Sequence, residues 1–181
     1  SKFIGHPNNK LPGIEMNSGS LGHGLPVCVG MALAGKMDRK NYRVYTVMGD
    51  GELAEGSIWE GAMAAAHYQL DNLCAVVDRN RLQISGNTEE VMAHDDLHQR
   101  FGSFGWFVLD VKNGNSVEEL NQAFEKAKTV KGRPSVIIAN TIKGCGSLLM
   151  ENKAGWHHHV PDDTEYETII KDLRARREAA S

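Results

Sequence analysis

An acidic and an amide side chain stand at the ends of two apolar runs in this sequence. The turn Gly49-Asp50-Gly51 follows the run 44–48, and Asn80 follows the run 73–77. Glycines let the backbone turn sharply and approach a ligand closely. If the two runs are neighbouring parallel strands, the two oxygen-bearing side chains converge at one edge of the sheet. Carboxylate and amide oxygens are ligands that Mg²⁺ accepts together with phosphate groups, so the spacing favours a magnesium-phosphate site.

The elements that must position these residues follow from the hydrophobic pattern. Apolar runs predict parallel strands near residues 43–48, 73–78, 106–111 and 134–140. Helical periodicity lies between them, and the resulting fold class is α/β, a doubly wound and mostly parallel sheet with helices on both faces. The expected helices cover residues 26–37, 53–70, a short stretch from about 96, 117–127 after a capping box at Ser116, and 164–177.

The remaining segments are read as loops. Residues 1–24 contain too many glycines and prolines for a regular element, and residues 79–90 are polar. The helix at 27–37 is apolar nearly all round, so we expect it to be buried. We expect one domain over residues 1–181, in which 157–181 is a C-terminal extension ending in a helix.

Bulk properties exclude several classes of protein. The 181 residues suit one core, and 20 Lys and Arg against 23 Asp and Glu give no basic field for nucleic acid. No apolar stretch approaches the roughly 20 residues of a membrane-spanning helix. The three cysteines are scattered and fit neither a disulfide framework nor a Cys-x-x-Cys metal site. We expect a protein of a reducing compartment, the cytoplasm.

A Gly-Asp-Gly turn alone is common, but its longer context is specific. GDGELAEGSIWEG followed by DRNRLQISG resembles the thiamine-diphosphate fingerprint of the transketolase family. GHPNNKLPGIEMNSGSLGHGL precedes it, and IKGCGS and AGWHHHVP follow it in the same order as in the family. The resemblance runs from Gly5 to about Pro161, which is nearly the whole chain.

The resemblance implies thiamine diphosphate and Mg²⁺ as cofactors. It assigns the side chains of Asp50 and Asn80 and the carbonyl group of Leu82 as metal ligands. The cofactor-binding residues that it implies are Gly19, Leu21, Gly49, Asp50, Gly51, Glu52, Glu55, His67, Asn80 and Ile84. Ser85-Gly86 stands where many relatives have Asp-Gly, which affects only the shape of that loop.

Three residues carry an implied catalytic role. His6 and His157 are placed in the substrate channel, since an imidazole near neutrality can exchange protons with sugar hydroxyls. Glu55 is placed at a subunit interface, although a solvated helix surface is the ordinary position for such a residue. His67 is placed beside the diphosphate, whereas His23 has no match in the family.

A second interpretation of the residues 157–159 is a metal-binding triple histidine. Consecutive residues do not share a helix face, which disfavours this interpretation.

The resemblance also indicates what this chain lacks. In the family, a separate pyrimidine-binding domain supplies the carboxylate that protonates the aminopyrimidine, and an earlier histidine-bearing segment is expected before residue 1. The chain is therefore expected to act with a pyrimidine-domain subunit, as a dimer of heterodimers, on sugar phosphates. Its expected activity is ketol transfer by a transketolase-type transferase that is inactive without the partner. The sequence names neither the sugar nor the partner.

Three alternatives remain at this point. A 1-deoxyxylulose-5-phosphate synthase-like enzyme shares the Gly-Asp-Gly and Asn pattern, but the AGWHHHVP segment favours transketolase. A non-catalytic cofactor-binding paralogue is disfavoured by the intact Asp50 and Asn80. A nicotinamide dehydrogenase is least favoured, because no Gly-x-Gly-x-x-Gly joins a strand to a helix.

Overall fold

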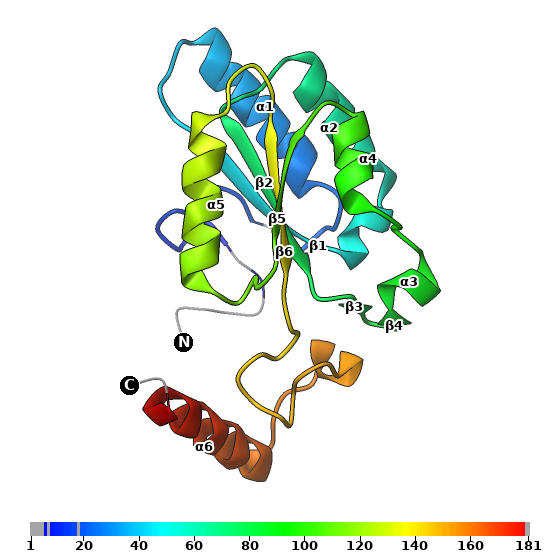
Figure 1. The fold of residues 1–181 in the computed structure, drawn as a ribbon, viewed down its shortest axis with the longest axis vertical. Coiled ribbons are helices and arrows are strands. Elements are labelled where there is room, and N and C mark those ends of the chain that lie inside the picture. Colours follow the sequence, from blue (N-terminus) through cyan, green and yellow to red (C-terminus); the bar gives the residue numbers. More distant parts are fainter. Residues whose placement is uncertain (1–5, 7, 18, 180–181) are drawn as a thin grey trace.

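A four-stranded parallel sheet forms the centre of the molecule (Figure 1). The computed structural model describes residues 6, 8–17 and 19–179, so the outermost ends of the expected domain lie outside the described residues. The strands are β1 (Val44–Gly49), β2 (Leu73–Arg79), β5 (Phe107–Val111) and β6 (Ser135–Asn140), in the order β1-β2-β6-β5. All three pairings are parallel. The strands predicted from the apolar runs are confirmed.

Helices cover both faces of this sheet, as the hydrophobic pattern predicts. On one face, α1 (Gly24–Met37), α2 (Gly56–His67) and α4 (Leu97–Ser103) enclose the larger core. On the other face, α5 (Val117–Thr129) buries Ala123 and Ala127 against β2, β5 and β6. β2 and β6 are central strands, and their apolar runs are long because both of their faces are covered.

Two apolar surfaces remain open to solvent. The prediction that the first helix is fully buried is wrong: α1 buries one face through Leu25, Val29, Ala32 and Gly35. On its outer face, Val27 is 41% and Met37 is 74% exposed. On the edge strand β1, Val47 is 73% exposed on the face that α5 covers only in part. A helix that is apolar on its outer side suits a molecule that has further contacts there.

Short elements line the edge where the strands end. A 3₁₀ turn, η1 (Gly51–Ala54), separates β1 from α2, so the expected helix 53–70 begins and ends a few residues inside its predicted bounds. The expected polar loop 79–90 contains a small antiparallel hairpin, β3 (Leu82–Gln83) with β4 (Gly86–Asn87), and the short helix α3 (Thr88–Val91). These elements are too short to produce a recognisable hydrophobic periodicity in the sequence.

The C-terminal part stands apart from the sheet. After η2 (Ala154–His157), helix α6 (Asp163–Ala179) has no buried residue in its described part and lies below the sheet in Figure 1. Polar contacts attach it to the preceding loop: Ser147 Oγ donates to Asp172 at 2.6 Å, and Arg176 pairs with Glu151 at 2.6 Å. Within the described residues, no helix is long and apolar enough to cross a membrane.

The three cysteines offer a test of the core. Burial raises the pKa of the Cys74 thiol to about 11, and burial also raises the pKa of Cys28, whereas Cys145 is exposed. At pH 8, Cys74 then carries a thiolate in about one molecule per thousand. We expect one thiol of the native chain to react fast with an aromatic disulfide reagent, and Cys145→Ser to remove that fast phase. In denaturant, all three thiols should react, and rapid reaction of Cys74 in the native chain would contradict the fold.

Candidate cofactor-binding site

Asp50 joins the ends of two neighbouring strands. It follows β1, and its side chain is 2% exposed. Asp50 Oδ1 accepts a hydrogen bond from the backbone N–H of Gly51 at 2.9 Å, and Oδ2 accepts one from the backbone N–H of Arg81 at 2.5 Å. Arg81 follows Asn80 at the end of β2. The loops that carry Asp50 and Asn80 therefore meet at the carboxyl edge of the sheet.

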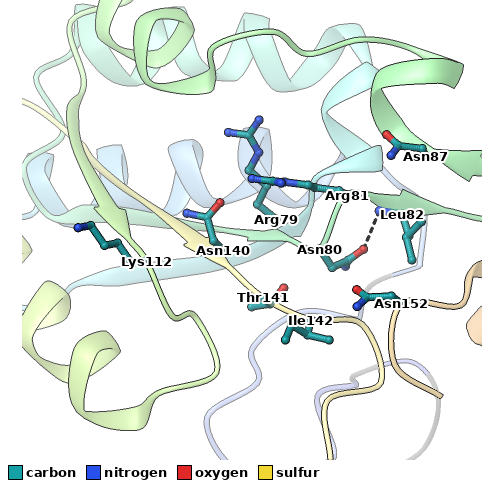
Figure 2. A pocket seen from close by; sticks show the side chains of 10 residues that line it. All are labelled: Arg79, Asn80, Arg81, Leu82, Asn87, Lys112, Asn140, Thr141, Ile142 and Asn152. Atoms are coloured by element: carbon teal, nitrogen blue, oxygen red, sulfur yellow. Dashed lines mark hydrogen bonds between the residues drawn. The ribbon is translucent and has the colours of Figure 1, made fainter. Parts of the chain in front are cut away.

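Asn80 and its loop lie directly beside the Gly-Asp-Gly turn. Asn80 Oδ1 accepts from the backbone N–H of Leu82 at 3.0 Å, the contact drawn in Figure 2. A Cβ atom added at Gly51 would stand 2.9 Å from Cβ of Gln83, so this close approach requires glycine. Asp50, Asn80 and Leu82, the three residues expected to bind the metal, thus lie within two touching loops.

The electrostatics of Asp50 fit a cation. Burial raises the pKa of this carboxyl, the nearby Asp78 carboxylate raises it further, and the two backbone N–H groups and His94 oppose these effects. The hydrogen bonds described above come from backbone groups, and a buried carboxylate without a cation is costly. A hard cation held by a carboxylate, an amide oxygen and a carbonyl oxygen would remove that cost. Among the described residues, no cluster of three His, Cys, Asp or Glu side chains offers another metal site.

Glu52 connects the glycine-rich segment to this edge. Its Oε1 accepts from the backbone N–H of Gly22 at 3.0 Å, and its Oε2 accepts from the backbone N–H of Gly49 at 3.2 Å. Ser57 Oγ donates to the carbonyl oxygen of Gly22 at 2.8 Å. The segment around Leu21 is therefore held against the start of α2 by side chains of η1 and α2.

Glu55 lies next to this contact but points to solvent. It is the residue before α2, makes no side-chain capping bond, and is exposed. In this chain Glu55 therefore lies on a solvated surface, and its burial would require a second chain. Leu21 and Ile84, also expected to bind the cofactor, are 55% and 64% exposed.

His6 and His157 approach the same side of the molecule from opposite ends of the sequence. A Cβ atom added at Gly19 would stand 3.0 Å from Cδ2 of His6, so the ring covers that glycine. His157 lies in η2, beside β3. Its Nδ1 is 3.3 Å from Nζ of Lys143. Burial, followed by the Lys143 and His158 charges, lowers the pKa of His157, so its imidazole is neutral at pH 7.

His67 is an expected site residue that the structure places elsewhere. It ends α2, a helix of 12 residues that starts beside Asp50 and runs back along the sheet. At 1.5 Å per residue, this puts His67 about 18 Å away, at the amino edge where β2 begins. The next residues there, Tyr68 and Gln69, accept hydrogen bonds from Lys36. The expectation that His67 lies beside the diphosphate is therefore corrected.

Two residues of this region were not predicted from the sequence. Lys143 contacts His157, and its place in the Ile142-Lys143-Gly144 segment was an available signal. His94 is 2% exposed, its ring faces the backbone of Asp50, and burial lowers its pKa. Val91, Met92 and Ala93 precede it and two aspartates follow it, and this mixed context did not indicate burial. Within the described residues the triple histidine forms no cluster of metal-binding side chains, and His159 contacts Glu165 at 2.7 Å.

The fold and this edge define a doubly wound α/β domain with a buried carboxylate, an amide side chain and glycine-rich loops at the carboxyl edge of its sheet. A family model described as "Transketolase, thiamine diphosphate binding domain" matches residues 1–174. The chain belongs to this family.

Similar curated proteins and solved structures are also transketolases or transketolase subunits. The chain is 49% identical over 178 residues to one subunit of the apulose-4-phosphate transketolase of Phocaeicola vulgatus, covering 98% of this chain and 63% of that relative. It is 41% identical over 161 residues to the 6-deoxy-6-sulfo-D-fructose transketolase subunit SqwG of a Clostridium species, covering 89% and 58%. The transketolase structure from Campylobacter jejuni superposes with a TM-score of 0.85 at 32% identity, covering 97% of this chain and 28% of that one. The chain thus spans less than two thirds of these proteins.

Removal of the buried carboxylate tests the metal site. We expect wild type to bind thiamine diphosphate more tightly with Mg²⁺ than without it, and Asp50→Ala to lose this difference. Changes in the surroundings of metal ligands already cost about 10–100-fold in affinity, so loss of a ligand should cost at least as much. Calorimetric titration measures the dissociation constant of thiamine diphosphate with and without Mg²⁺. Asp38→Ala, which removes an exposed carboxylate, is the control. Equal magnesium dependence in Asp50→Ala and wild type would remove the assignment.

Two glycine substitutions test the loop that Glu52 holds. Gly22 has φ +85°, and an added Cβ atom would stand 2.6 Å from Oγ of Ser57 and 2.7 Å from Cβ of Glu55. We expect Gly22→Ala to cost at least roughly 1–2 kcal/mol of stability and to weaken cofactor binding. Gly30, exposed inside α1 with open space around it, is the matched control, and Gly30→Ala should add roughly 0.5–1 kcal/mol. The stability of both variants and of wild type is measured by thermal unfolding. If Gly22→Ala were as stable as wild type, the described geometry at Gly22 would be contradicted.

Proposed function

We propose that this chain is the diphosphate-binding half of a two-subunit transketolase. The enzyme would transfer a two-carbon ketol unit from a ketose phosphate to an aldose phosphate, with thiamine diphosphate and Mg²⁺. The observation that carries the proposal is the contact between Asp50 Oδ2 and the backbone N–H of Arg81, which brings the Asp50 and Asn80 loops together. Two relatives named as single subunits of transketolases, of which the chain covers 58–63%, support a division between two chains.

The residues of this chain would bind and orient the cofactor. Asp50, Asn80 and the carbonyl group of Leu82 would hold Mg²⁺ on the diphosphate, and the N–H of Gly51 would face a phosphate oxygen. Glu52 would keep the Gly19 to Gly22 segment in place beside it. When bound, thiamine diphosphate supplies the nucleophilic carbon that the side chains of the protein lack.

The histidines would handle protons on the sugar. His157 is neutral at pH 7 because burial and Lys143 lower its pKa, so its imidazole can accept a proton from a hydroxyl group. Nζ of Lys143 lies 3.3 Å from Nδ1 of His157 and would face the sugar phosphate. His6 would approach from the Gly19 side. Glu55, which is exposed in this chain, would act only once a second chain covers it.

We propose the sugar substrate as a chemical class. The two relatives described above carry the names of different sugars, apulose-4-phosphate and 6-deoxy-6-sulfo-D-fructose. We propose a ketose phosphate donor and an aldose phosphate acceptor, used in the cytoplasm in carbohydrate metabolism of the pentose phosphate type. No described contact favours the synthase-like or the non-catalytic alternative.

A pyrimidine-domain subunit would cover the apolar surface near the cofactor. Leu21, Val27, Met63 and Ile84 are between 41% and 64% exposed, and they lie on the segments that flank the site. We propose that this surface contacts the partner chain and that two such pairs associate as a dimer of heterodimers. Burial of such side chains would contribute about 25 cal/mol per Å² before the costs of association.

Reconstitution with a partner tests the proposal. We expect the purified chain to transfer no ketol units, and to become active with a pyrimidine-domain subunit that is inactive alone. Cofactor at about 100 times its dissociation constant would stabilise the binding-competent species by roughly 2.7 kcal/mol. For a domain of this size, that corresponds to a shift in melting temperature of about 5–10 °C.

Two controls separate the parts of this proposal. Asp50→Ala mixed with the same partner should restore neither activity nor the magnesium-dependent shift. A larger shift with the partner than without it agrees with a cofactor site between chains. Full ketol transfer by the chain alone, unchanged by any partner, would show that the missing carboxylate lies within this chain.

A further inference from the structure

A buried histidine lies against the Gly-Asp-Gly turn, outside the segments that carry the family resemblance. His94 is 2% exposed, although the three residues before it and the two after it are exposed. Its ring faces the backbone of Asp50, whereas the Asp50 carboxylate faces the backbone N–H groups of Gly51 and Arg81. The turn is therefore held in two ways, through its carboxylate and through its main chain.

Packing alone does not explain a histidine at this position. Within the described residues, Nε2 of His94 is buried and has no hydrogen-bond partner. A buried polar atom without a partner lowers stability, and an apolar side chain of similar size avoids that loss. The contact of the ring with the backbone of Asp50 is an interaction that an apolar side chain could not make.

The position of His94 depends on the carboxylate of Glu89. Oε2 of Glu89 accepts hydrogen bonds from the backbone N–H groups of His94 at 3.2 Å and of Asp95 at 3.3 Å. Asp95 has φ +50°, a left-handed conformation that is uncommon for residues other than glycine. Glu89 therefore holds a tight turn that directs His94 into the core while its sequence neighbours stay exposed.

Glu89 is itself fixed at its backbone and at its side chain. Its backbone N–H donates to Oδ1 of Asn87 at 2.9 Å, the contact that caps α3. Its Oε1 lies 3.8 Å from Nη2 of Arg79, at the end of β2. A series of contacts thus runs from the end of β2 through Glu89 and His94 to Asp50 at the end of β1.

We propose that His94 and Glu89 are positioning residues that orient the Asp50 carboxylate. Glu89 fixes the turn at 94–95, the turn holds the His94 ring against the backbone of Asp50, and this contact sets the direction of the carboxylate before a cation binds. Neither side chain touches the cation or the cofactor. The consequence for magnesium rests on the function proposed above, whereas the position of the Asp50 turn can be measured without any ligand.

Amide hydrogen exchange tests the positioning directly. It would be followed by NMR in the ¹⁵N-labelled chain without Mg²⁺ or thiamine diphosphate, at the N–H groups of Gly51 and Arg81 that donate to Asp50. We expect His94→Leu and Glu89→Ala to speed exchange at both groups about tenfold or more, because the turn opens more often. Glu90→Ala, which removes the neighbouring exposed carboxylate of α3, is the matched control and should leave both rates unchanged.

Cofactor binding and stability give a second measurement. In calorimetric titration, we expect His94→Leu and Glu89→Ala to lose about 10–100-fold of the magnesium-dependent affinity for thiamine diphosphate, with binding in the absence of Mg²⁺ unchanged. His94→Gln keeps an N–H donor and should restore part of this affinity. His94→Leu should melt no lower than wild type, because it removes the unpartnered Nε2 atom. A merely structural histidine would give the opposite pattern, a lower melting temperature with unchanged magnesium dependence.

The outcomes separate this inference from the proposed function. Wild-type exchange rates at Gly51 and Arg81 in both variants, or wild-type magnesium dependence in His94→Leu, would overturn the positioning role. If wild type itself showed no magnesium dependence while both variants exchanged faster, the metal assignment would fail and the orientation of Asp50 by His94 and Glu89 would be supported.

Discussion

The site depends on one buried carboxylate. Asp50 accepts hydrogen bonds from its own turn and from the backbone N–H of Arg81, so it holds the ends of β1 and β2 at a fixed distance. The parallel pairing of these strands brings both ends to the same edge, and Gly51 allows the β3 loop to approach. Without a cation this carboxylate is an electrostatic cost, which the raised pKa of Asp50 records. The groups around this buried charge, His94 among them, therefore offset its cost only in part.

The sheet is predictable from the sequence because burial on both faces leaves a continuous apolar signal. The runs at β2 and β6 are of this kind, whereas the edge strand β1 buries alternate residues. The ends of the β1 and β2 runs place Asp50 and Asn80 at one edge. The sequence predicts a residue's place poorly when that place depends on the direction in which a helix runs, or on burial by residues far away in the sequence. His67 was predicted at the wrong edge, although a helix that leaves a strand end must run back along the sheet.

Other features could not be predicted from the sequence, for physical reasons. The β3–β4 hairpin has two residues per strand, which is too few for a period. His94 is buried between an apolar stretch and two aspartates, and Glu89 accepts a hydrogen bond from its backbone N–H group. The apolar outer face of α1 predicted burial, and the structure leaves it exposed because nothing in the described chain lies over it. Composition indicates that a face is apolar without indicating which molecule covers it.

The edge strand β1 has a consequence for how such a chain is made in a cell. Within the described residues, one side of β1 has no neighbouring strand, and Val47 is 73% exposed close to that open edge. Unpaired strand edges next to apolar side chains favour association between identical chains. Isolated chains would therefore tend to associate with one another through this edge as they accumulate in a cell.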